Sequence, residues 1–204
     1  MRREEETVDP RAERSRRRIA QAIYELHKTI GPAQTTVSAI ASTAGVQRLT
    51  VYRHFPDELD LHSACLAHWR ELHPWPDPSP WRTIADPRER LRTALGEIYR
   101  FFAEVEPLFL LGSADMPRLP KLQQADAPLF EHWEQMRRVL LNGWGVRGRR
   151  RRRLAAAISA AIDFQTWYAL TRRAGASDED AVELAVCQAE CAVRASRGRP
   201  HRPA

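Results

Sequence analysis

The chain has 204 residues, of which 43% are hydrophobic and 28% are charged. This composition supplies enough apolar side chains for a packed core and excludes a chain that is disordered throughout. The net charge of +6 favours anionic partners, nucleic acid or a membrane surface, without deciding between them.

Targeting and redox signals point to the cytoplasm. The first residues, Met1 to Glu6, are charged rather than apolar, so we expect no signal peptide. No apolar run reaches the roughly 18 residues that a membrane-spanning helix needs, and we expect no membrane partner. The three cysteines form no CxxC pair, which argues against a disulfide framework and fits a reducing, cytoplasmic location.

The first 56 residues predict a charged arm followed by three helices. Asp9 and Pro10 favour a helix start, because aspartate is a good N-cap and proline suits the first helical position. Thr36 can cap the second helix, and Gly45 can adopt the left-handed conformation that ends it. The predicted segments are a disordered arm at 1–8 and helices at about 10–30, 37–44 and 47–54.

From Asp57 onward the chain predicts a larger set of helices. A proline-rich stretch at 73–87 is expected to be a structured loop, and further prolines interrupt residues 105–127. The helix at 149–173 has apolar residues on more than one face, which is typical of a helix buried on two sides. The predicted helices are 57–72, 88–104, 128–142, 149–173 and 178–195, followed by a disordered tail at 196–204.

The fold class that follows is all-α, because no segment has the alternating pattern of a strand. We expect a three-helix helix-turn-helix domain at 9–56 that binds DNA. A helical domain at 57–196 would bind a ligand and dimerise. Its two last helices are apolar and rich in small residues, so we expect them to pair with their mates across a two-fold axis in a four-helix interface.

Residues 35–56 carry the most specific motif. Two short helices are joined by a glycine-containing turn, which is the helix-turn-helix layout. Its second helix would present polar side chains to the major groove. Over about residues 10–62 the chain resembles the DNA-binding domain of the TetR family. The resemblance rests on ten positions in register: Thr36, Ile40, Ala41, Ala44, Gly45, Val46, Thr50, Tyr52, His54 and Phe55.

The resemblance implies a DNA-binding transcription regulator, a ligand-responsive repressor that binds a palindromic double-stranded operator as a homodimer. Thr36 and Tyr52 would contact phosphates, and Arg48 and Thr50 would face base edges. The guanidinium fork of Arg48 matches O6 and N7 of guanine. Arginines 14, 16, 17 and 18 could touch further phosphates. The full set of implied DNA contacts is Thr36, Gln47, Arg48, Thr50, Tyr52, Arg53 and His54.

Aromatic side chains are frequent beyond the motif, and most of them would be core. An apolar, aromatic-lined cavity is also how helical domains bind small molecules. We therefore hypothesise a pocket for a small hydrophobic or aromatic ligand, with His132 or Gln165 as polar anchors. Its lining would come from Trp69, Phe102, Phe109, Trp133, Phe164 and Trp167.

Three other features have two interpretations each. The arginines at 147 and 149–153 could be a second nucleic-acid patch or a solvated face. Cys187 and Cys191 lie on one face of a helix and could be a redox sensor, or small hydrophobes buried at the dimer seam. Three histidines around Cys65 have spacings that match no standard metal site, so we predict no metal and no cofactor.

Two other function classes remain open. Enzyme motifs are absent from the sequence, so we predict that the chain is not an enzyme, although catalysis by a helical enzyme that carries such a head is conceivable. The alternative is a small-molecule-binding helical protein with weak or lost DNA binding. Glu58, where the family often has lysine, and Gln47, a poor N-cap, make that alternative conceivable.

Overall fold

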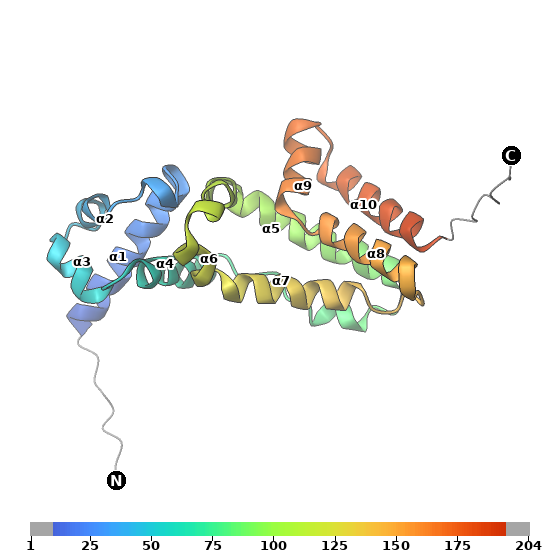
Figure 1. Cartoon of the computed structure of the whole chain (residues 1–204), viewed down its shortest axis with the longest axis horizontal. Helices are drawn as coiled ribbons and strands as arrows, with labels where there is room; N and C mark the ends of the chain where they lie inside the picture. Colours follow the sequence, from blue (N-terminus) through green and yellow to red (C-terminus); the bar gives the residue numbers. More distant parts are fainter. Residues whose placement is uncertain (1–9, 195–204) are drawn as a thin grey trace, which may run out of the picture. The chain divides into compact units, whose positions relative to one another are not determined.

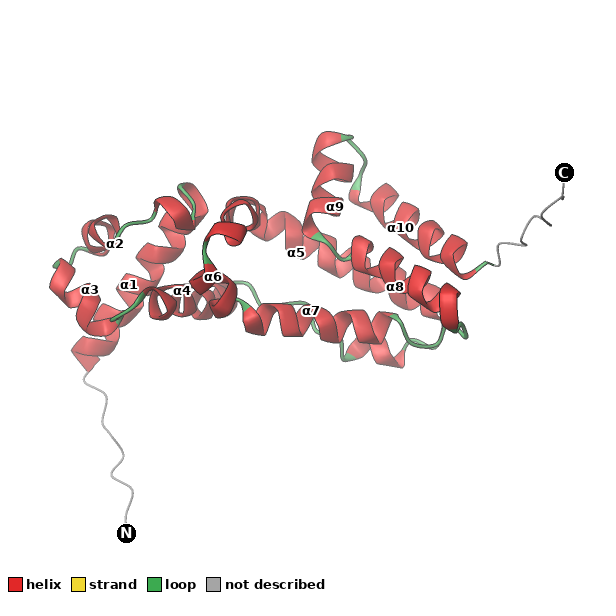
Figure 2. Ribbon diagram, in the orientation of Figure 1, coloured by secondary structure: helices red, strands yellow, loops and turns green. Residues whose placement is uncertain are grey.

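The structure is a computed structural model that describes residues 10–194 (Figure 1). Every regular element in that range is helical and no strand forms there, which confirms the all-α class (Figure 2). None of these helices is both long and apolar enough to cross a membrane. The predicted arm at 1–8, the cap at Asp9 and the tail at 196–204 lie outside the described residues.

The chain divides into two compact units. Unit 1 comprises the residues up to Trp75 together with Glu104–Phe130, and unit 2 comprises Pro76–Ala103 together with the residues from Glu131 onward. The helices α5 (Pro87–Asp115) and α7 (Ala127–Leu140) each contribute residues to both units. The predicted boundary at residues 56 and 57 does not coincide with the division between these two compact units, and it stays a prediction.

Unit 1 is built around α1, whose apolar stripe includes the fully buried Ile19 and Ile23. In sequence order, α1 packs against α2 and α4, α2 packs against α3, and α4 packs against α6. These contacts place α2 directly on the long first helix and α3 on α2. The bounds are α1 Pro10–Thr29, α2 Val37–Ala44, α3 Arg48–His54, α4 Glu58–Leu72 and α6 Pro120–Ala125.

Helix α5 extends beyond its predicted end. The sequence predicts a helix over 88–104, because Pro107 removes a backbone donor and clashes with the preceding turn. The structure instead continues the helix to Asp115 with Pro107 inside it. The prediction of a break at Pro107 was wrong. The buried residues Phe101, Phe102 and Val105 pack this part of the helix into the protein, so tertiary packing outweighs the local cost of proline.

Unit 2 contains α8 (Gly148–Ala161), α9 (Phe164–Tyr168) and α10 (Asp178–Val193), and α8 packs along α10. A single helix over 149–173 was predicted, but the chain breaks after α8. Asp163 causes the break, because its Oδ1 accepts a hydrogen bond from the Thr166 amide at 2.9 Å and caps a new helix. Helix α9 then continues as a π-helical turn over Ala169–Arg173.

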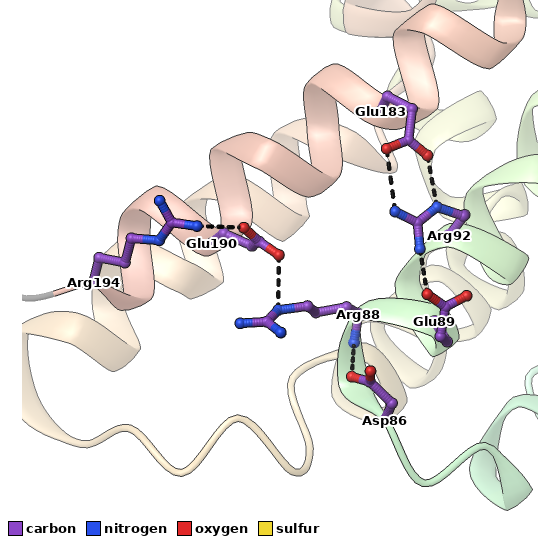
Figure 3. Close-up of polar contacts among 7 residues, drawn as sticks. All are labelled: Asp86, Arg88, Glu89, Arg92, Glu183, Glu190 and Arg194. Atoms are coloured by element: carbon purple, nitrogen blue, oxygen red, sulfur yellow. Dashed lines mark hydrogen bonds and ion pairs between the residues drawn. The ribbon is translucent and has the colours of Figure 1, made fainter.

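Ion pairs on the surface of unit 2 join α10 to the first turns of α5 (Figure 3). The guanidinium of Arg92 donates to both carboxylate oxygens of Glu183, at 2.6 and 3.1 Å. Arg88 Nε lies 2.7 Å from Glu190, which also accepts from Arg194 at 2.9 Å. Exposed ion pairs contribute little stability, but a bidentate pair is directional. This network therefore links α10 to α5 in a defined orientation, while α8 supplies the main packing surface of α10.

Candidate nucleic-acid interface

Helix α3 presents most of its side chains to solvent. Val51 is fully buried and Phe55, directly after the helix, is 1% exposed, so these two residues anchor α3. In contrast, Arg48, Tyr52 and Arg53 are exposed. Two cations and a phenol on the outer face of a short helix can bind anionic, hydrogen-bonding surfaces such as the phosphates and base edges of DNA.

The turn before α3 has the geometry that the sequence predicts. Thr36 caps α2, and its Oγ1 accepts a hydrogen bond from the Ala39 amide at 3.2 Å. Gly45 ends α2 with φ 61° and ψ 44°, the left-handed conformation. The Val46 amide then donates to the Ala41 carbonyl at 3.0 Å, which satisfies one of the last carbonyls of the helix. The hydroxyl proton of Thr36 remains available for donation to a phosphate.

Arginines of α1 hold the ends of both short helices. Arg18 Nη2 donates to the carbonyl oxygen of Ala44, the last residue of α2. Arg16 Nη1 donates to the carbonyl oxygen of His54 at 3.1 Å, and its guanidinium lies 4.5 Å from the centre of the Phe55 ring. Cations are favourable at helix C-termini, where the macrodipole is negative. Two of the four arginines expected to touch phosphates thus fix the position of α2 and α3.

The other predicted DNA contacts lie around the same face. Gln47 is exposed and precedes α3 as an N-cap without a side-chain hydrogen bond, which agrees with its being a poor cap. Thr50 and His54 are half-buried. Burial lowers the pKa of His54, and the charges of Arg53 and Arg16 lower it further, so His54 is neutral at pH 7.

One exposed residue on this face is not among the predicted DNA contacts. Leu49 is 74% exposed, the largest exposed fraction among the large hydrophobic residues that the structure describes as exposed. It follows Arg48 in the first turn of α3. An apolar side chain in that position can contact the methyl group of thymine. The sequence contains a signal for this exposure. Val51 is predicted to point into the core, and a residue two positions earlier on a helix lies on the opposite side.

Helix α4 begins next to this interface with acidic residues. Asp57 Oδ1 accepts from the Asp60 amide at 2.9 Å and caps the helix, as predicted. Glu58 Oε1 lies 3.5 Å from Nε2 of the buried His62. Carboxylates suit a helix N-terminus, where the macrodipole is positive. Glu58 therefore stabilises the start of α4, and a phosphate contact there would have to come from another group.

Titratable side chains form a cluster where α1, α4 and the end of α6 come together: His27, His62, Cys65 and Asp126. The rings of His27 and His62 are 5.4 Å apart between centroids, and Cys65 Sγ lies 3.3 Å from His27 Nδ1. Burial, and the neighbouring His62, lower the pKa of His27 to about 3, while burial raises the pKa of Asp126 to about 7. Among residues 10–194 no group of three or more histidine, cysteine or acidic side chains could hold a metal ion.

The expected ligand-pocket residues fall into two groups. In unit 2, Phe102 lies 5.5 Å from both Trp133 and Phe164, and 5.7 Å from Trp167, between ring centroids. The two residues predicted as polar anchors lie in different surroundings. His132 Nε2 donates to the Pro76 carbonyl at 2.8 Å, whereas Gln165 is exposed. In unit 1, Trp69 and Phe109 pack on each other at 5.6 Å.

The outer face of α10 carries apolar side chains. Leu184 is 54% exposed, and Cys187 and Cys191 are exposed on the same helical face. The inner face, which packs toward α8, is formed by small residues such as Ala181, Ala185 and Ala189. In the single chain the two cysteines are therefore not buried, and their predicted burial would require a second protomer.

Comparisons with known proteins agree with this arrangement. Residues 19–65 match the family model described as bacterial regulatory proteins, tetR family. The nucleoid occlusion factor SlmA of Marinobacter nauticus is 30% identical over 148 residues, covering 69% of this chain and 74% of the relative.

Solved structures share the fold. A TetR-like transcriptional regulator from Rhodococcus sp. RHA1 aligns with a TM-score of 0.63 at 18% identity, over 89% of this chain and 96% of that one. NalD of Pseudomonas aeruginosa, the secondary repressor of the MexAB-OprM multidrug efflux pump, aligns with a TM-score of 0.62 at 18% identity, over 90% and 98%. Together with this shared fold, the family model and the 30% identical relative show that the chain belongs to the TetR family of bacterial regulatory proteins and is a DNA-binding transcriptional regulator, not an enzyme.

Proposed function

We propose that the chain is a ligand-responsive repressor that binds a palindromic operator as a homodimer, with α3 in the major groove. The observation that carries the proposal is the exposure of Arg48, Tyr52 and Arg53 on a helix anchored by the buried Val51. Arg48 would read guanine, Leu49 would contact a thymine methyl group, and Tyr52 would contact a phosphate. Thr36, Gln47, Thr50 and His54 would complete the contact surface.

The test is selection of binding sites from a randomised duplex pool by the purified full-length protein. We expect enrichment of a palindrome whose half-sites lie about one helical turn of DNA apart, because two symmetry-related α3 helices must enter successive major grooves. A folded protein that enriches no sequence at low salt would contradict operator binding. It would favour the alternative of a helical ligand-binding protein with lost DNA binding.

Two features of unit 2 support the remaining parts of the proposal. The exposed apolar face of α10 would be covered by a second protomer in the homodimer. The aromatic cluster of Phe102, Trp133, Phe164 and Trp167 would adapt to a small hydrophobic or aromatic ligand. Ligand binding would favour a spacing of the two heads that fits the operator less well, which requires unequal ligand affinity for the two states.

The ligand part can be tested with an uncharged fluorescent probe, N-phenyl-1-naphthylamine. We expect a saturable increase in the fluorescence of this probe with the full-length protein. The probe should bind more weakly to Trp133→Leu, which replaces a half-buried aromatic side chain of the cluster. Phe130→Ala, which removes an aromatic side chain that is 50% exposed, serves as the matched control. Equal binding by the two variants would place the ligand elsewhere.

A further inference from the structure

A pocket of about 400 Å³ in unit 2 has a strongly positive lining. It lies among the short 3-10 helix Pro80–Thr83, the first turns of α5, the end of α7 and the start of α8. No described aspartate or glutamate lines it. Its polar lining consists of Arg82, Arg90, Gln135, Arg138, Asn142 and Arg151.

Arg90 is a buried cation without an acidic partner. Arg90 is 5% exposed, and its guanidinium donates only to backbone carbonyls. Nε donates to Trp81 and Ile84 at 3.1 Å each, Nη1 to Asn142 at 2.8 Å and Val139 at 3.4 Å, and Nη2 to Ile84 at 2.6 Å. Among residues 10–194 no ion pair joins Arg90 to a carboxylate. Carbonyl dipoles solvate the guanidinium but leave its net charge in place, and burial weakens its screening by solvent. An anion in the adjoining pocket would be attracted to it.

The positive charges of the exposed arginines in the pocket are also not fully neutralised by carboxylates. Within the described chain neither Arg82 nor Arg151 forms an ion pair. Arg138 lies 3.6 Å from Glu134, but that carboxylate is held more closely by Arg137 at 2.7 Å. The lining therefore carries several positive charges that no protein carboxylate fully neutralises.

Helix α8 adds to this positive potential. Arg151 lies in its first turn, which contains no acidic residue, and its N-cap Arg147 makes no side-chain capping hydrogen bond. Cations in the first turn oppose the macrodipole, so the sequence here is electrostatically unfavourable in the absence of an anion. A bound anion would relieve that repulsion and accept hydrogen bonds from guanidinium groups.

We propose that this pocket binds a phosphorylated small molecule, with the phosphate on the arginines and the carbon skeleton against Val139 and Leu141. Both apolar residues line the pocket. A phosphate suits the site better than a carboxylate, because it carries more charge and more acceptor oxygens. The volume is in the range of small-molecule sites, and the buried Arg90 is one of the lining residues. The inference does not depend on the proposed DNA or aromatic-ligand sites.

The test is isothermal titration of the full-length protein with inorganic phosphate, pyrophosphate and phenyl phosphate at physiological ionic strength. We expect one saturable site per chain that binds phenyl phosphate more tightly than inorganic phosphate, because only the ester places a ring on the apolar lining. Arg151→Gln and Arg138→Gln should each weaken binding about tenfold, which is the usual effect of losing one charge-assisted hydrogen bond.

Arg149→Gln is the matched control. It removes an exposed arginine from the same turn of α8 that does not line the pocket, and it should change the affinity less than about twofold, as expected for a screened charge outside the contact shell. Equal weakening by Arg149→Gln and Arg151→Gln would show a diffuse field and overturn the proposal. Absence of saturable binding would also overturn it. So would stoichiometric displacement of pyrophosphate by duplex DNA of random sequence, which would identify the arginines as a nucleic-acid surface.

Discussion

Gly45 shows how a single residue positions the proposed recognition helix. Its left-handed φ of 61° is unfavourable for residues with a Cβ atom, and a Cβ here would come within 2.8 Å of Arg18 Nη2. That guanidinium group holds the end of α2 through the Ala44 carbonyl. The turn conformation and the arginine cap therefore depend on the same glycine.

We expect Gly45→Ala to lower the free energy of unfolding by about 1–2 kcal/mol, which is the cost of a left-handed conformation for a residue with a Cβ atom. Gly96→Ala is the control, because Gly96 lies inside α5 with no atom within 4 Å of its added Cβ. Alanine should leave stability unchanged or raise it there. Urea unfolding of both variants measures the difference, and a Gly45→Ala protein as stable as Gly96→Ala would contradict this account of the turn.

At single positions, the sequence predicted the residues that act through local geometry. The cap Thr36, the turn Gly45 and the buried Val51 follow from patterns within a few residues of each other. The roles of Arg16 and Arg18 did not follow, because their partners lie 38 and 26 residues further along the chain. A long side chain can reach many carbonyls, and only the packing of α1 on the short helices selects one.

At the scale of elements, the ends of two helices were predicted wrongly, because each prediction relied on a single sequence feature. The expected break at Pro107 relied on the local cost of proline, which packing of α5 overrides. The expected continuous helix at 149–173 relied on apolar spacing and overlooked Asp163, which has Thr166 three residues later. Apolar spacing shows which faces are buried, whereas capping residues show where helices end.

The packing of α1, α4 and α6 depends on buried groups whose titrations oppose each other. Burial lowers the pKa of His27 to about 3, so the stability from its neutral form is present above pH 6.5 and is lost as the pH falls toward 3. Burial lowers the pKa of His62 also. Burial raises the pKa of Asp126 to about 7, so its contribution is present below pH 3.8 and is lost as the pH rises toward 7.

Replacing Asp126 should therefore reveal how the buried histidines make the free energy of unfolding depend on pH. Between pH 4.5 and 6.5 we expect the free energy of unfolding of Asp126→Asn to fall more steeply on acidification than that of the unmodified chain. The added slope is about 1.4 kcal/mol per pH unit, the value for one proton. His27→Gln should shift the slope by about the same amount in the opposite direction, because it leaves the Asp126 titration uncompensated. Urea titrations at several pH values provide the comparison, and three parallel curves would show that these groups do not titrate as described.

At the scale of the whole molecule, the outer face of α10 remains exposed in the single chain. Leu184 is 54% exposed beside two exposed cysteines. The all-α class and the helix-turn-helix head could be predicted from periodicity and turn chemistry. The partner of the outer face of α10 could not be predicted in this way, because periodicity shows that a face is apolar but not whether another surface meets it.

We expect Leu184→Arg to shift a dimer toward monomer, because a desolvated cation at an apolar interface is costly. Thr93→Arg, which adds the same charge at an exposed position of α5, should leave the dimer intact. Sedimentation equilibrium at micromolar protein measures both. A monomeric unmodified protein, or a Leu184→Arg dimer as tight as the control, would rule out this face as the interface.

The most direct test of the account is a salt titration of binding to the selected operator by the unmodified protein, Arg48→Ala and Arg100→Ala. We predict that affinity falls steeply as salt rises, since phosphate contacts release counterions. Arg48→Ala should lose about 1–3 kcal/mol of binding free energy, the usual value of a bidentate guanine contact. Arg100→Ala removes an exposed arginine of α5 and should bind as the unmodified protein does. If Arg48→Ala binds its operator as tightly as Arg100→Ala, α3 does not read the DNA as proposed.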